Sequence, residues 1–387
     1  MATITKRGNT YKITVSCGYD SGGKQIRQHM TWKPAPGMTK RQIEKELERQ
    51  KVLFEEKVNS GLFITSDIKL GDFIPLWVEK YLDVTARERT KQGYKGMLPR
   101  IKTALGHIKL SKLQPHHLND FYAQLTDLGL SPATVRKYHA ILSSMCSTAV
   151  KWGMIAHNPC ERADPPKLKR QEPVFLNELQ AGRLLQLLKD EEIQFRTAIT
   201  LLMFSGLRRG EVCGLEWEDF YFDHRMVDVC RTSQYTQEKG IYTDDTKNFT
   251  SRRTVKLPAF VFDLLAEYRV WQNKERERLG DQWQESGRLF TQWNGLPIHP
   301  DTLTKQFSKF VAKHSDELPK GLHIHSLRHT NATLLIAQGV NIRTVSSRLG
   351  HGQTSTTMNI YAHAIQSADE KAAETLENIL KPNKKTG

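Results

Sequence analysis

A proline-rich, basic interruption divides the 387-residue chain. Residues 158–170 contain Pro159 and the pair Pro165 and Pro166, and they end in three basic residues and a leucine. Proline lacks a backbone N–H and fixes φ, so no helix runs through such a stretch. We therefore expect a linker here, with separately folded units on either side, in agreement with a length typical of two or three domains.

The first 65 residues predict a small sheet followed by a helix. Residues 11–17 and 24–32 alternate between apolar and polar side chains, and a glycine-rich turn at 18–23 separates them. Pro34 and Pro36 break the chain, and Thr39 can cap a helix whose apolar positions are Ile43, Leu47 and Phe54. A two- or three-stranded sheet this basic can lie in a DNA major groove, although a plain protein-contact module fits the same pattern.

The next hundred residues have helical periodicity. Phe73, Trp77 and Tyr81 recur every four residues, and Ser131-Pro132 begins a long helix with an apolar stripe. Basic side chains between these segments are read as phosphate contacts of a compact helical domain. They are Arg87, Arg89, Lys91, Lys95, Arg100 and Lys102.

The positive charge is concentrated in the first 170 residues. Residues 1–66 hold 12 basic and 6 acidic side chains, residues 67–170 hold 17 and 9, and the remaining 217 hold 28 and 27. This bias favours a polyanionic partner, with nucleic acid ahead of an anionic membrane surface. The absence of a long apolar run disfavours membrane and secreted proteins, and five scattered cysteines fit a reducing cytosol.

The third unit is mixed, with amphipathic helices around a strand-rich region at 226–257. Gly206-Leu-Arg208 permits a tight turn and places an arginine at the start of a helix that Glu211 continues, which suits an anion. Arg209 is adjacent to Arg208. Lys247 follows a threonine near what is predicted to be a hairpin tip, where a solvated lysine is the ordinary interpretation.

Two histidine-containing patterns follow. His325 and Arg328 are three residues apart on one helix face and can approach a single oxyanion. His325 and His329 have the spacing of metal ligands, but Ser326 breaks the His-Glu-x-x-His pattern and no carboxylate offers a third ligand. His351 follows a helix stop at Gly350, and Tyr361 lies among polar residues.

In this order, these motifs resemble those of the tyrosine recombinases, the phage integrase family. Six active positions are filled over about 150 residues: Arg208, Lys247, His325, Arg328, His351 and Tyr361. Arg208 is chosen over Arg209 because it occupies the family's Gly-Leu-Arg position. The N-terminal units resemble, more loosely, the arm-type and core-binding domains of integrases from conjugative transposons and Gram-positive phages. The resemblance implies a multidomain α+β protein with an arm-type DNA-binding domain at 1–65, a helical core-binding domain at 66–165 and a mixed, mainly α catalytic domain at 166–387 with a small antiparallel sheet and a tail helix.

The resemblance also implies the chemistry. Tyr361 would attack a DNA phosphodiester to give a 3′-phosphotyrosine, and Arg208 with Arg328 would bind the non-bridging oxygens. Lys247 would protonate the leaving oxygen and His325 would assist removal of the tyrosine proton. His351 would hydrogen-bond the phosphate, Glu211 would support the site, and His363 would be structural. Neither metal, cofactor nor ATP is expected.

The implied partners are double-stranded DNA with core and arm attachment sites, three further copies in a homotetramer, an excisionase and a host DNA-bending protein. The implied location is the cytoplasm, at the bacterial nucleoid. The helix predicted at 368–380 would dock on a neighbouring subunit or on its own domain.

A type IB topoisomerase or telomere resolvase uses similar residues. A regulator that has lost catalysis and a metal-dependent nuclease are competing hypotheses, and phage or transposon origin stays open.

Overall fold

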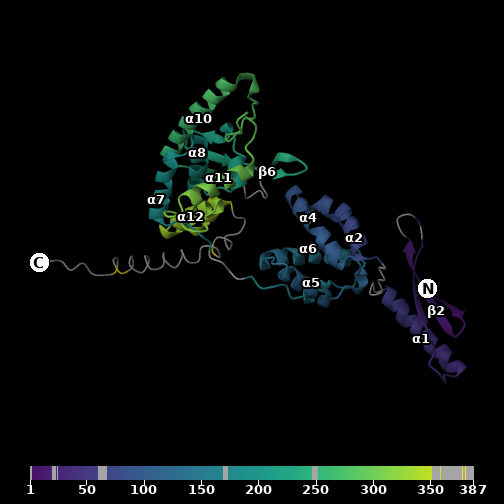
Figure 1. Cartoon of the computed structure of the whole chain (residues 1–387). Coiled ribbons are helices and arrows are strands. Elements are labelled where there is room, and N and C mark those ends of the chain that lie inside the picture. The colour runs from purple at the N-terminus through teal and green to yellow at the C-terminus, as the bar shows by residue number, and fades with distance from the viewer. Residues whose placement is uncertain are drawn as a thin grey trace. The chain divides into compact units, whose positions relative to one another are not determined.

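The computed structural model describes residues 2–19, 23, 25–59, 68–168, 173–245 and 252–350, together with 358, 377 and 380 (Figure 1). The chain forms two compact units, Met1–Arg170 and Gln171–Gly387. Each unit is described by itself below. Among the described residues, no helix has the length and apolar character that crossing a membrane requires.

The first unit begins with a three-stranded antiparallel sheet covered on one face by a helix. Ile13 and Val15 alternate with polar residues, so both point to the same face, where they are buried against Leu47 and Phe54 of the helix. The strands run in the order β1-β2-β3, and the predicted sheet and helix are confirmed. The elements are β1 (Thr3–Arg7), β2 (Thr10–Tyr19), β3 (Gln25–Trp32) and α1 (Lys40–Asn59).

The rest of the first unit is helical and has its own core. Trp77 is fully buried there, and its indole N–H donates to the Thr148 hydroxyl at 3.2 Å. Ser131 caps the long helix through the Thr134 N–H, as the Ser-Pro pair predicts. The elements are α2 (Leu70–Trp77), the π-helical η1 (Val78–Leu82), α3 (Asp83–Thr85), α4 (Glu88–Leu105), η2 (Leu110–Lys112), α5 (Pro115–Asp127), α6 (Pro132–Lys151) and η3 (Pro159–Arg162).

The predicted linker is shorter than its sequence suggests. Asn158 is buried and donates to Ser147 Oγ at 2.9 Å, while Cys160 and Ala163 belong to the helical core. Residues 158–163 are therefore part of the first unit. The prolines do prevent a continuous α-helix, but a short 3-10 turn accommodates Pro159 at its start and still buries apolar side chains.

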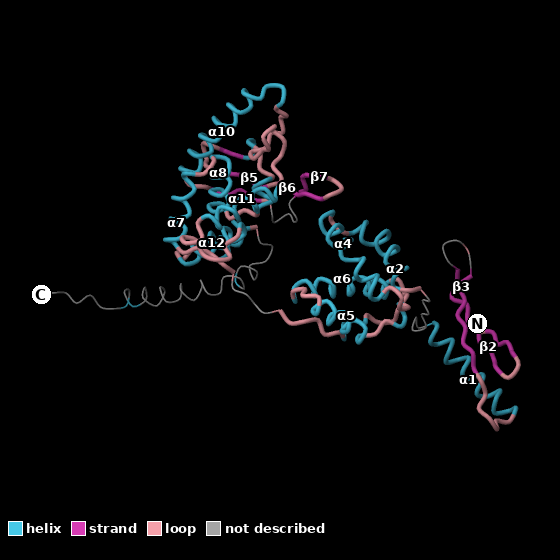
Figure 2. Tube along the Cα trace, viewed as in Figure 1, coloured by secondary structure: helices cyan, strands magenta, loops and turns pink. Residues whose placement is uncertain are grey.

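The second unit surrounds helix α8, which is buried on nearly all sides (Figure 2). Such a helix is apolar all round because it is enclosed by other elements. Helices α10, α11 and α12 contact it. The helices are α7 (Glu178–Leu187), η4 (Leu188–Asp190), α8 (Ile193–Ser205), α9 (Arg209–Cys213), η5 (Trp217–Asp219), α10 (Ala259–Leu279), η7 (Gly280–Gln282), α11 (Pro300–Lys313), α12 (Ile324–Ala337) and α13 (Ile342–Leu349).

Strands of the second unit form two small sheets instead of one. Strand β8 pairs with β5, whereas β7 pairs only with β6 in the described chain. The hairpin turn of the β6–β7 pair lies at 237–239. Lys247, which the sequence predicts near a hairpin tip, lies outside the described residues. The strands are β4 (Phe220–Tyr221), β5 (Met226–Val229), β6 (Arg231–Thr236), β7 (Gly240–Asp245) and β8 (Arg253–Lys256).

Candidate active site

The turn between α8 and α9 is built around Gly206. This residue ends α8 with φ of 67°, a left-handed conformation that favours glycine. A Cβ at this position would lie 2.7 Å from Leu349 Cδ2 and 2.8 Å from Asn331 Oδ1. Glycine is required both by the backbone and by the close approach of α12 and α13. The turn therefore holds Arg208 in a fixed position at the start of α9.

Replacing Gly206 with alanine should lower the free energy of unfolding by about 1–3 kcal/mol, because the substitution adds backbone strain and crowds Leu349. Unfolding in urea, monitored by circular dichroism, measures this free energy. Gly182→Ala in α7 is the matched control, since no heavy atom lies within 4 Å of its added Cβ. Equal stability of the Gly206 and Gly182 variants would contradict this explanation of the turn.

Arg208 is the N-cap residue of α9 and is locked to Glu211. Its backbone N–H donates to Glu211 Oε2 at 2.9 Å, and its Nη1 donates to Oε1 at 2.8 Å. Its Nη2 reaches the Gly350 carbonyl at 3.3 Å. The Arg208 side chain is 40% exposed, whereas that of Glu211 is 4% exposed. A buried carboxylate thus holds a guanidinium that still faces outward.

Arg209 has a different environment from Arg208. Its Nη1 donates to Asp301 Oδ1 and to Thr304 Oγ1, both at 2.7 Å, and both acceptors are on α11. This arginine joins α9 to α11. The two neighbouring arginines are therefore distinguished by their contacts, and only Arg208 contacts Glu211 and Gly350.

Arg253, at the start of β8, completes an Arg–Glu–Arg cluster and is its second buried member. Its Nη2 lies 2.9 Å from Glu211 Oε2, and its Nε donates to the Arg348 carbonyl at 2.6 Å. Its side chain is 6% exposed. Burial would raise the pKa of Glu211, but Arg253 first and then Arg208 outweigh burial and hold that pKa below its usual value. Glu211 is therefore a carboxylate shared by two guanidiniums.

Arg328 is the third described arginine of the site. It lies on α12 and is 2% exposed. Its Nη1 donates to the Gly206 carbonyl and its Nη2 to the Leu349 carbonyl, both at 2.7 Å. These carbonyls terminate α8 and α13, where unpaired helix carbonyls favour a cation. Arg328 therefore ties together the same two chain segments that border Arg208.

His325 lies one helical turn before Arg328. Part of this residue is accessible to solvent, and its ring packs edge-on against His329, with 4.9 Å between ring centroids. Desolvation by the surrounding protein, followed by the charges of Arg328, His323 and Arg208, lowers the pKa of His325 to about 4. The imidazole is therefore neutral at pH 7, and one of its ring nitrogens can accept a hydrogen bond. In the described part of the chain, no three His, Cys, Asp or Glu residues are placed to hold a metal ion.

The structure brings together three of the six predicted site residues, Arg208, His325 and Arg328. The other three, Lys247, His351 and Tyr361, lie outside the described residues, as do His363 and nearly all of the tail helix predicted at 368–380. Sequence reasoning did not identify Arg253. Arg253 and the buried Val255 lie on the same face of β8. An arginine at a strand position that points inward was therefore the sequence signal that could have identified it.

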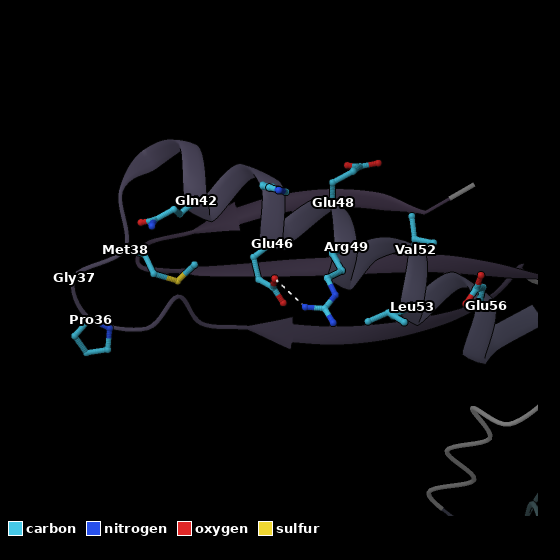
Figure 3. Close-up of a pocket in the computed structure, with 11 residues that line it drawn as sticks. Pro36, Gly37, Met38, Gln42, Glu46, Glu48, Arg49, Val52, Leu53 and Glu56 are labelled. Carbon is cyan, nitrogen blue, oxygen red and sulfur yellow. Dashed lines mark ion pairs between the residues drawn. The ribbon is translucent and has the colours of Figure 1, made fainter.

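A separate groove lies on the first unit, along α1 (Figure 3). It has a volume of about 1100 Å³ and follows the α1 face opposite Leu47 and Phe54. Glu46 pairs with Arg49 across its wall at 3.6 Å, and Val52 and Leu53 are exposed there. Acidic and basic side chains are both present, so this face of α1 lacks the cationic character that a polyanion requires. None of the six predicted site residues lines it.

Comparison with known proteins decides the family. Residues 174–367 match the phage integrase family, and residues 70–165 match the phage integrase SAM-like domain. The chain is 30% identical to a XerC-like tyrosine recombinase of Caldanaerobacter subterraneus, over 95% of this chain and 96% of that protein. The chain belongs to the phage integrase family. It is a tyrosine recombinase of the integrase type, as the motif order predicts.

Two further similarities extend over most of the chain. The ICEBs1 integrase of Bacillus subtilis is 25% identical over 96% of this chain and 97% of that protein. The solved structure of the Tn1549 transposon integrase in complex with a circular intermediate DNA has a TM-score of 0.68 and 21% identity, covering 80% of this chain and 99% of that one. The predicted multidomain α+β fold is confirmed by this likeness and by the described elements.

Proposed function

We propose that this recombinase integrates and excises a mobile element by cutting and rejoining double-stranded DNA through a 3′-phosphotyrosine. The observation that carries the proposal is the convergence of Arg208, His325 and Arg328, which come from two separate segments of the chain, around Glu211 and the end of α13. Cationic groups held in place beforehand are suited to a phosphoryl transition state, where negative charge accumulates on the non-bridging oxygens.

Each residue has a role in this proposal. Arg208 and Arg328 neutralise the scissile phosphate, and neutral His325 accepts the proton of Tyr361 as its oxygen attacks phosphorus. Lys247 donates a proton to the departing 5′-oxygen, and His351 hydrogen-bonds the phosphate. The P–O bond to the 5′-oxygen breaks as the bond to Tyr361 forms, so the energy of the bond is retained for rejoining. Neither metal nor ATP takes part in these steps.

Recombination of two duplexes tests the function itself. The protein is mixed with one duplex carrying the joined ends of its element and one carrying the target site, and recombinant junctions are scored. We expect recombinant duplexes and four-way junction intermediates. Relaxation of supercoils without recombinants would instead indicate a topoisomerase-like activity, and closed hairpin ends would indicate a telomere resolvase.

We infer that the chain binds DNA through its first 165 residues, with an arm-type domain at 1–65 and a core-binding domain at 66–165. Separate hydrophobic clusters in these two regions support this division. In the core-binding region, Arg89, Arg100 and Lys102 are exposed, whereas Lys91 and Lys95 form ion pairs with Glu88 and Asp83 at 2.9 Å. The exposed residues are the stronger candidates for phosphate contacts.

The sheet face opposite α1 is suited to DNA in the arm-type domain. Since Ile13 and Val15 point toward α1, Lys12 and Thr14 point away from it, and their strand partners bring His29 to the same face. Arg7 and Arg27 share this face by the same alternation. Cations interleaved with hydroxyl groups can contact both phosphates and base edges.

DNA binding by this sheet should strengthen as the pH falls through the range in which His29 titrates. Desolvation and the charges of Lys12, Arg27 and Arg7 lower the pKa of His29 in the free protein. A bound phosphate raises it again, so proton uptake accompanies binding and the affinity rises as the pH falls toward the lowered pKa of free His29. Fluorescence anisotropy with arm-site DNA across that range measures the effect. His29→Gln should flatten the profile, and an unchanged profile in that variant would contradict the assignment.

The proposed assembly is a homotetramer on two duplexes, with an excisionase and a host bending protein that direct the reaction. Pairwise strand exchange through a four-way junction requires four active sites, of which two act at a time. The tail predicted at 368–380 would connect neighbouring subunits and coordinate cleavage. Analytical ultracentrifugation with and without synthetic four-way junctions tests the stoichiometry.

A further inference from the structure

We propose that Arg253 is a positioning residue whose positive charge keeps Arg208 available for the scissile phosphate. Arg253 does not itself contact the reacting atoms. Its role rests on the proposed role of Arg208 and extends that role to the buried groups behind Arg208. The geometry of Glu211 and its two arginine partners supports it.

Glu211 contacts both arginines at comparable distances. Its carboxylate oxygens lie 2.8 Å from Arg208 Nη1 and 2.9 Å from Arg253 Nη2. The three side chains form a layered arrangement, since Arg253 and Glu211 are buried while Arg208 is 40% exposed. The cluster therefore has a net charge of about +1, with the exposed arginine on its outer side.

Removal of Arg253 would change the charge balance at Arg208. Glu211 would be left with Arg208 as its single arginine partner among these three groups. A buried carboxylate without its partner is strongly unfavourable, so Glu211 would bind Arg208 more tightly. The remaining pair would be neutral. Held tightly in a neutral ion pair, Arg208 would attract a phosphate less and reach it less readily.

Arg253 is also held so that it cannot easily leave the cluster. Its Nε donates to the Arg348 carbonyl at 2.6 Å, and a Cβ on Gly350 would come within 2.8 Å of its Nη1. Gly350 has φ of 66° and ends α13. The guanidinium thus packs directly against the α13 terminus, on which the Arg208 Nη2 contact also lies.

The decisive comparison is between Arg253→Gln and the double variant Arg253→Gln with Glu211→Gln. The assay is single-turnover formation of covalent protein–DNA complex on a nicked duplex carrying the element's own end. Arg253→Gln should slow this step by about 10- to 100-fold. Losses of this size are typical when a residue that orients a functional side chain is removed, as with the residues that orient metal ligands. The double variant should recover most of that loss, because the amide oxygen of glutamine at 211 can still accept a hydrogen bond from Arg208 but carries no charge to neutralise it.

A purely structural role predicts the opposite order. If Arg253 served only to hold the fold, removing Glu211 as well would leave cleavage as slow as in the single variant or slower, and that result would overturn the proposal. Circular dichroism and gel-shift binding of the same duplex confirm that each variant is folded. Arg253→Lys is a second test variant, which is informative even if the glutamine variants unfold. It keeps the positive charge and should retain most of the wild-type cleavage rate. A lysine variant as slow as Arg208→Lys would also overturn it.

The same assay separates this inference from the proposed function. If Arg208→Lys cleaves at the wild-type rate, the role of Arg208 is wrong and the proposal on Arg253 has no basis. If Arg208→Lys is inactive but the double variant is not faster than Arg253→Gln, only the inference on Arg253 fails. Each outcome thus identifies which of the two statements is incorrect.

Discussion

Lysine in place of Arg208 should slow strand cleavage by about 10²- to 10³-fold, the usual effect of removing one aligned donor to transition-state charge. A lysine ammonium keeps the charge but cannot form the paired hydrogen bonds of a guanidinium, and it cannot reproduce the contacts that Arg208 makes with Glu211 and Gly350. Single-turnover cleavage of a nicked duplex measures the rate. Binding of the uncleaved duplex, followed by gel shift, should change little.

Arg209→Lys is the matched control for this prediction. It makes the same chemical change one residue away, where the side chain bonds to Asp301 and Thr304. That variant should cleave at close to the wild-type rate and lose at most about 1 kcal/mol of stability, as is usual for an exposed ion pair. An inactive Arg209→Lys beside an active Arg208→Lys would exchange the roles of the two arginines.

Phenylalanine in place of Tyr361 should abolish cleavage altogether, while DNA affinity stays close to that of the wild type. The substitution removes one hydroxyl, which is the proposed nucleophile, and leaves the cationic side chains in place. Cleavage gels and gel shifts on the same duplex measure the two properties separately. Loss of binding in this variant would count against the assignment of Tyr361.

Tyr221→Phe provides the control for the nucleophile. Tyr221 is an exposed tyrosine of the same unit, and its hydroxyl donates to Asp228 at 3.1 Å, away from the Glu211 cluster. Its removal should leave cleavage intact. If both tyrosine variants lost cleavage, the defect would reflect general damage to the unit rather than the loss of a nucleophile.

Local sequence patterns predicted most of the helices, strands and turns, because interactions between neighbouring residues determine them. The strand alternation around Ile13, the Ser131 cap and the left-handed glycine at 206 each depend on neighbouring residues, and all appear in the structure. The failures involve longer-range pairing. Nothing local to residues 226–257 indicates that β8 returns to β5 while β6 and β7 pair separately. Likewise, burial of Cys160 depends on a helix core distant from the proline-rich segment itself.

The same contrast between local patterns and long-range contacts applies to the candidate active site. Motif spacing identified Arg208, His325 and Arg328, and the structure adds the contacts that distinguish Arg208 from Arg209. Arg253 was missed, because its importance comes from a carboxylate 42 residues earlier in the chain. Its position on the inward face of β8 was a signal of burial, but the role of a buried charge is recognisable only when its partner is known, and the partner is set by tertiary structure.

The central claim is that Tyr361 becomes covalently joined to DNA, and identification of the joined peptide tests it most directly. Wild-type protein is incubated in EDTA with a nicked duplex carrying its own element's end, and the trapped complex is digested with trypsin and nuclease. We predict a nucleotide adduct on the peptide spanning residues 349–371, whose single tyrosine is Tyr361. An adduct on any other residue, or cleavage that stops in EDTA, would contradict the claim.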